Sequence, residues 1–93
     1  MKTDFKTFKM KAINGGIQFI AFFPNGYGAS IVQHSFSYGH EKNLWELAVL
    51  KGDEKKWNLT YETPIASDVI GHLSETEVNE IVDKIKALPL ETK

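Results

Sequence analysis

The stretch "FKMKAINGGIQFIAFF", residues 8–23, decides more about the fold than any other part of the chain. Its first part alternates apolar residues with lysines, as in a β-strand whose side chains point to opposite faces in turn. Asn14-Gly15 follows, and this dipeptide tolerates positive φ angles at both central positions of a type I′ hairpin turn. The apolar run at 17–23 then returns as a second strand. The stretch therefore predicts an antiparallel β-hairpin.

Three further strands are expected after this hairpin, separated by clusters of turn residues. They span residues 29–36, 44–51 and 57–63. In the strand at 44–51, Trp45, Leu47 and Val49 share one face, because they stand two residues apart. Pro64 ends the last strand, since proline cannot donate a hydrogen bond to the ladder.

The stretch "LSETEVNEIVDKIKAL", residues 73–88, changes to a helical period. Ser74 is an N-cap, and Glu77 three residues later completes a capping box. The apolar residues fall on one stripe, spaced as on one side of a helix. They are Val78, Ile81, Val82, Ile85 and Leu88. An amphipathic helix is therefore predicted at about 74–88.

Together these periods predict an α+β fold in a single domain, residues 1–93. We expect an antiparallel β-meander of about five strands, within residues 8–63, with the C-terminal amphipathic helix packed on one face. The connecting segment 64–73 is expected to be irregular or to form a single turn. Because runs such as "FIAFF" are apolar on both sides, the second face of the sheet should be partly covered too. A second protomer is one way of covering it.

Composition narrows the classes of function. The chain has 93 residues, 42% hydrophobic and 12% aromatic, which is typical of a compact globular domain. Its 11 basic residues are all lysines and face 12 acidic ones, for a formal net charge of −1. The lack of arginine, whose planar fork grips phosphates and base edges, disfavours phosphoryl transfer and specific nucleic-acid binding. The lack of cysteine excludes disulfides and thiolate metal sites, and it fits a reducing cytoplasm.

The segment "PNGYGAS", residues 24–30, has three candidate roles. A phosphate-binding loop needs glycines that open a helix, whereas these glycines precede a strand-like run. A secretory signal needs a continuous apolar segment after a basic start, but Asp4 stands among the early lysines and Asn14-Gly15-Gly16-Gln18 interrupts the apolar segment. We therefore expect a turn whose glycines serve backbone geometry. The apolar runs are also far too short to span a bilayer, so no membrane association is expected.

Candidate catalytic and metal-binding groups form no recognised pattern. The histidines, His34, His40 and His72, lack the spacing of a metal site. Glu46 stands in an apolar strand and would be an acid–base candidate if it were buried near His34. The alternative is a carboxylate that faces solvent or pairs with a lysine on the neighbouring strand. We expect no enzyme activity, no metal and no cofactor.

The aromatic residues support the remaining functional hypothesis, because they outnumber what one small core needs. The candidate binding residues are Tyr27, Phe36, Tyr38, Trp45 and Trp57. An exposed aromatic surface can bind a protein without any net charge. Alternatively, with Lys51, Lys55 and Lys56 it could form a weak nucleic-acid-binding module, since bases stack on aromatic rings beside basic groups. The third interpretation is that these aromatics fill the core or form cross-strand pairs.

Four short segments also stand out together: NGYGAS (25–30), SYG (37–39), LWELAVLK (44–51) and DVIGHLS (68–74). In these segments the chain resembles small uncharacterised proteins encoded by bacteriophages and prophages. The resemblance implies a phage-derived accessory protein in the cytoplasm of a bacterial host. It also implies action by binding, with a host or phage protein as partner, and it assigns no activity to particular residues. We expect protein–protein interaction, with a homodimer among the candidate states, rather than catalysis or nucleic-acid binding.

Overall fold

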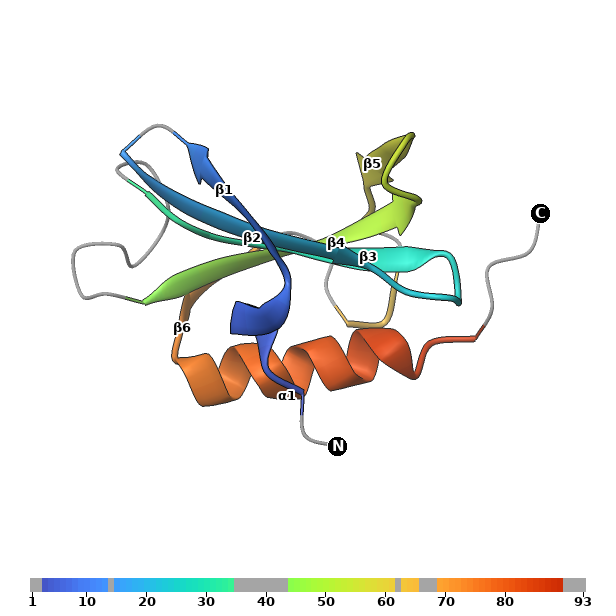
Figure 1. The fold of residues 1–93 in the computed structure, drawn as a ribbon. Coiled ribbons are helices and arrows are strands. Elements are labelled where there is room, and N and C mark those ends of the chain that lie inside the picture. Colours follow the sequence, from blue (N-terminus) through green and yellow to red (C-terminus); the bar gives the residue numbers. More distant parts are fainter. Residues whose placement is uncertain (1–2, 14, 35–43, 62, 66–68, 90–93) are drawn as a thin grey trace.

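The computed structural model describes residues 3–13, 15–34, 44–61, 63–65 and 69–89 (Figure 1). Its elements in chain order are a 3-10 helix Phe5–Thr7, β1 Lys9–Ile13, β2 Gly16–Phe22, β3 Tyr27–Gln33, β4 Trp45–Gly52, β5 Trp57–Leu59, β6 Ile70–Leu73 and α1 Glu75–Lys86. Within the described ranges, no helix has the length and apolar character needed to cross a membrane.

The strands form one antiparallel sheet in which neighbours along the chain are neighbours in space, in the order β1-β2-β3-β4-β5. The far edge of β4 is shared, because β5 pairs with its C-terminal end and β6 with its N-terminal end. Helix α1 lies across one face of this sheet (Figure 1). The predicted α+β meander with a C-terminal helix on one face is thus confirmed.

The segment before the helix differs from the prediction. Its sequence predicts an irregular connection, but residues 70–73 form strand β6, which places Leu73 opposite Trp45 and Ile70 opposite Leu47. The register shifts between these two pairs, and His72 has a positive φ of 58°. Four residues with such an irregular backbone carry too little periodicity to be recognised from sequence. The strand exists because β4 offers it an edge.

The boundaries of β3 and β5 differ most from the prediction. β3 begins at Tyr27, two residues before the predicted start. β5 ends at Leu59, although the backbone N–H of Thr60 still donates to the carbonyl of Val49 at 2.9 Å. The predicted end of the third strand, at 35 and 36, lies outside the described residues. These shifts leave the order and pairing of the predicted strands intact.

The N-terminus of α1 has the predicted capping box. The backbone N–H of Glu77 donates to Ser74 Oγ at 3.2 Å, and that of Ser74 donates to Glu77 Oε1 at 2.9 Å. The bond from the Ser74 backbone, and then that with its side chain, holds the pKa of the Glu77 carboxyl below its ordinary value of 4.5. The cap fixes the start of the helix and so the angular position of its apolar stripe.

The core lies between α1 and the sheet face that the helix covers. Phe5 of the 3-10 helix packs edge-on against Phe19 and Trp45, with ring centroids 5.4 Å and 5.0 Å away. Around this aromatic cluster lie the buried aliphatic side chains of both layers. They are Ala29, Ile31, Leu47, Val49, Leu73, Val78, Val82 and Ile85. Alternation along the strands therefore places the predicted residues Trp45, Leu47 and Val49 in the core.

The C-terminal end of α1 is held by the turn between β2 and β3. Asn25 is buried there, and its Nδ2 donates to the carbonyls of Ile85, Lys86 and Leu88 at 2.8, 3.3 and 3.1 Å. Its Oδ1 accepts from the backbone N–H of Tyr27 at 3.1 Å. Terminal helix carbonyls have no partner within the helix, so this side chain satisfies groups that would otherwise need water. The turn predicted within "PNGYGAS" thus also serves as a helix cap.

Candidate protein-binding groove

The predicted binding aromatics do not form one surface. Trp45 is only 7% exposed and belongs to the core, so it is not available to a partner. Tyr27 is partly buried and packs against the same core, on the helix side of the sheet. Trp57 is 39% exposed and lies on the opposite side. Phe36 and Tyr38 lie outside the described residues. Of the described candidates, Trp57 alone stays a surface residue.

The open face of the sheet is set by the register of its strands. Ile20 lies opposite Ser30, and Phe22 opposite Gly28, so these residues alternate with the buried Phe19. Gly28 in turn lies opposite Leu50, which is fully buried yet outside the main core cluster. The face turned away from α1 therefore carries a smaller apolar layer of its own.

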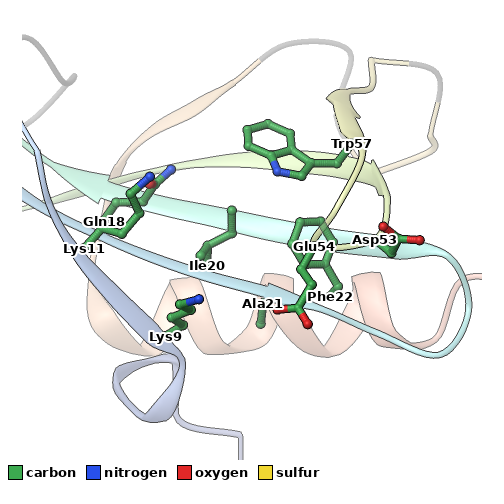
Figure 2. A pocket seen from close by; sticks show the side chains of 9 residues that line it. All are labelled: Lys9, Lys11, Gln18, Ile20, Ala21, Phe22, Asp53, Glu54 and Trp57. Atoms are coloured by element: carbon green, nitrogen blue, oxygen red, sulfur yellow. The ribbon is translucent and has the colours of Figure 1, made fainter.

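A groove of about 460 Å³ crosses this open face. Its walls come from β1 and β2 on one side and from the β4–β5 turn and β5 on the other (Figure 2). It is lined by Lys9, Lys11, Gln18, Ile20, Ala21, Phe22, Asp53, Glu54 and Trp57. The groove thus joins segments from the first third and the middle of the chain.

The apolar part of the groove is an aromatic pair beside Ile20. The rings of Phe22 and Trp57 lie 6.3 Å apart and are tilted by 44°. Phe22 lies close above Gly28, where an added Cβ would come within 2.7 Å of the ring and 2.5 Å of the Ala21 carbonyl oxygen. Glycine is therefore required at 28, because any side chain would displace the ring that forms the floor.

The polar part of the groove has charges of opposite sign on its two sides. Lys9 and Lys11 project from β1, where they lie opposite Ile20 and Gln18 of β2. Asp53 and Glu54 come from the β4–β5 turn (Figure 2). Neither lysine forms an ion pair with any residue in the described part of the chain. The two lysines therefore remain available for an acidic partner.

The acidic side is shaped by hydrogen bonds within its own turn. Asp53 Oδ1 accepts from the backbone N–H groups of Lys55 and Lys56 at 2.9 and 3.0 Å. The backbones of Asp53 and Lys56 also exchange two hydrogen bonds, at 3.0 and 3.2 Å. An aspartate that bonds its own turn in this way fixes the turn's conformation. The acidic end of the groove is thus held in place by local hydrogen bonds.

The groove does not contain the acid–base candidates considered from sequence. Glu46 and His34 are absent from its lining, and His72 is exposed on β6. Among the described residues, no group of three or more histidines and carboxylates is arranged to hold a metal ion. His40 lies outside those residues. The groove offers apolar area, two ammonium groups and two carboxylates.

Sequence reasoning missed most of the groove, although one signal pointed to it. If Phe19 faces the core, then Ile20 and Phe22 must face away, and the helix cannot cover them. The positions of Asp53 and Glu54 had no such signal, because they depend on how the β4–β5 turn folds over the sheet.

Comparisons with known proteins add no identity to this picture. No family model matches the chain, and no curated protein or solved structure matches it.

Proposed function

We propose that this chain is a phage-derived accessory protein of the bacterial cytoplasm that acts by binding protein, without catalysis, through the groove on its open sheet face. One observation carries the proposal: an exposed tryptophan and an apolar floor lie between two lysines that form no ion pair among the described residues and an acidic turn held by its own hydrogen bonds. The partner classes are a host protein, a phage protein and a second copy of the chain.

The composition of the groove favours a protein partner. Protein interfaces concentrate their binding energy in aromatic anchors such as Trp57 and surround them with polar groups. Charges of both signs on the rim fix the orientation and register of a protein partner. A rim with positive charge alone would instead fit a polyanion.

The same observation argues against nucleic acid as the ligand. Asp53 and Glu54 share the groove with Trp57, so a phosphate backbone close enough to let a base stack there would meet two carboxylates. Lys55 and Lys56 are exposed on the same turn but do not line the groove. The nucleic-acid alternative remains the natural counter-hypothesis for the experiment.

The test is affinity capture with tagged protein from lysate of phage-infected bacteria, comparing the wild type with Trp57→Ala. We expect the wild type to retain a specific protein, including untagged chain where it is supplied, and Trp57→Ala to lose it. Tyr61→Ala is the matched control, because Tyr61 is a 44% exposed aromatic outside the groove. Equal capture by wild type and Trp57→Ala would contradict the proposal. So would steeply salt-dependent binding of single-stranded DNA that requires Trp57.

A further inference from the structure

We infer that the groove binds a second copy of this chain, so that two open sheet faces pack against each other about a two-fold axis. The inference rests on the proposed function of the groove as a protein-binding surface, and it commits that surface to one partner. Three properties of the described residues support it: the placement of charge, the apolar floor and the size of the face.

The charges of the groove are self-complementary. In a two-fold interface, a residue i of one copy that contacts j of the other implies the contact of j with i as well. Turning one copy about an axis through the groove, near Ile20, places the lysines of each β1 beside the β4–β5 turn of its partner. Two positive charges, on Lys9 and Lys11, then meet two negative charges, on Asp53 and Glu54, at both ends of the interface.

In the part of the chain that the structure describes, these opposite charges form no ion pair with one another, which leaves them for the partner. Lys9 and Lys11 have no ion pair among the described residues, whereas Lys6 nearby bonds to Glu75 of the helix at 2.6 Å. Lys9 and Lys11 lie on the opposite face of the sheet from that helix. A face-to-face dimer would bring the carboxylates of the partner copy to these two lysines.

The apolar floor lies between the two charged ends, where an interface core is expected. Ile20 and Phe22 are partly exposed there, and Trp57 is 39% exposed. Leu59, next to Trp57 on the same face of β5, is 47% exposed. Burying these side chains against their copies would remove apolar area that α1 cannot reach, since α1 lies on the other face (Figure 1).

The face has the size that a stable dimer needs. A standard interface buries about 800 Å² on each partner. The molecule extends 39 × 26 × 25 Å, so one of its broad faces offers an area of this order. Twisted sheets also pack face to face in two favoured orientations, aligned or nearly perpendicular. Self-association meets little long-range opposition, because the net charge is only −1.

The experiment is a charge swap read by light scattering after size exclusion. The wild type is expected to be a dimer. Lys9→Glu with Lys11→Glu, and separately Asp53→Lys with Glu54→Lys, are each expected to be monomeric, because each places like charges together at both ends. Mixing the two variants should restore a one-to-one heterodimer, in which every like-charge contact becomes an opposite-charge contact. A misfolded variant could not produce this rescue.

Lys55→Glu with Lys56→Glu is the matched control, because it makes the same charge change on the turn, outside the groove lining. It should remain a dimer. A monomeric wild type would overturn the inference, as would charge-swap variants that stay dimeric, or a mixture that stays monomeric while both variants show native circular dichroism. If a double variant fails to fold, two single variants supply the same test. Lys11→Glu and Glu54→Lys are made in separate chains and then mixed.

The outcomes also separate this inference from the proposed function. If the wild type is monomeric but Trp57→Ala still abolishes capture of another protein, the self-association inference fails and the groove remains a protein-binding site. If the groove variants change neither oligomeric state nor capture, both proposals fail.

Discussion

The two faces of the sheet are built from alternate residues of the same strands, yet α1 covers only one of them. On the helix side, Ile31 and Leu47 are completely buried. On the open side, the neighbouring Ile20 and Phe22 stay partly exposed beside Trp57. The difference arises because a single 12-residue helix can cover one face only. A sheet that is apolar on both sides therefore keeps part of its apolar area exposed on the second face.

The largest expected effect comes from matched truncations on the two faces. Leu47→Ala should lower the free energy of unfolding by about 3 kcal/mol, because it leaves a cavity in a close-packed core. Ile20→Ala should cost about 1 kcal/mol, since its side chain is partly solvated before the change. Urea unfolding followed by circular dichroism measures both, at a protein concentration low enough to keep the chain monomeric. Equal losses would show that the open face is packed as tightly as the covered one.

A smaller effect is expected at Gly28, which shapes the open face from below. Gly28→Ala should destabilise the fold by about 2 kcal/mol, because the new Cβ overlaps both the Phe22 ring and the Ala21 carbonyl oxygen. It should also weaken any binding in the groove, since the ring is displaced.

Combining Gly28→Ala with Phe22→Ala separates the two overlaps. Removing the ring relieves one overlap, so the double variant should be less destabilised than the sum of the single variants. Strict additivity would mean that the ring and the added methyl do not meet. Both quantities come from the same unfolding experiments.

The smallest effect concerns the helix that covers the first face. The capping hydrogen bonds lower the pKa of the Glu77 carboxyl from 4.5 in the folded state. Ionised Glu77 therefore stabilises the fold, and this contribution is fully present above pH 4.5. It is lost as the pH falls through the lowered pKa. Glu77→Gln should therefore melt slightly below the wild type near neutral pH, with the gap closing in acid. Glu80→Gln, three residues beyond the capping box, is the control. A gap in melting temperature that is unchanged in acid would rule out this linkage.

The covered face could be predicted from sequence because its information is local. The alternation of Trp45, Leu47 and Val49 and the stripe that begins at Val78 each specify one buried side. Because the apolar face of the sheet and the apolar stripe of the helix are both known, few arrangements bury the two against each other. The capping box at Ser74 likewise needed nothing beyond its own residues.

The groove could not be predicted in the same way, because its parts meet only in the folded sheet. Lys9 and Glu54 are far apart in sequence, and their proximity depends on the strand order and on the fold of the β4–β5 turn. Trp45 and Trp57 look alike in sequence, since each begins a strand. One is buried and the other exposed because of the strand register. Trp45 faces the helix, whereas Trp57 lies opposite Gly52 and faces the open side of the sheet.

The buried amide of Asn25 has a consequence for how the chain acquires its shape. The N-terminal cap of the helix is formed by residues of the helix segment itself. Its C-terminal carbonyls, in contrast, accept hydrogen bonds from the Asn25 side chain, which is 60 residues away from Ile85 in the sequence. The helix segment taken alone would therefore keep its start and fray at its end. During synthesis the β2–β3 turn emerges long before the helix, so Asn25 is already present when the helix forms. The end of α1 can therefore become ordered only when it docks on the β2–β3 turn and its carbonyls accept the hydrogen bonds from Asn25.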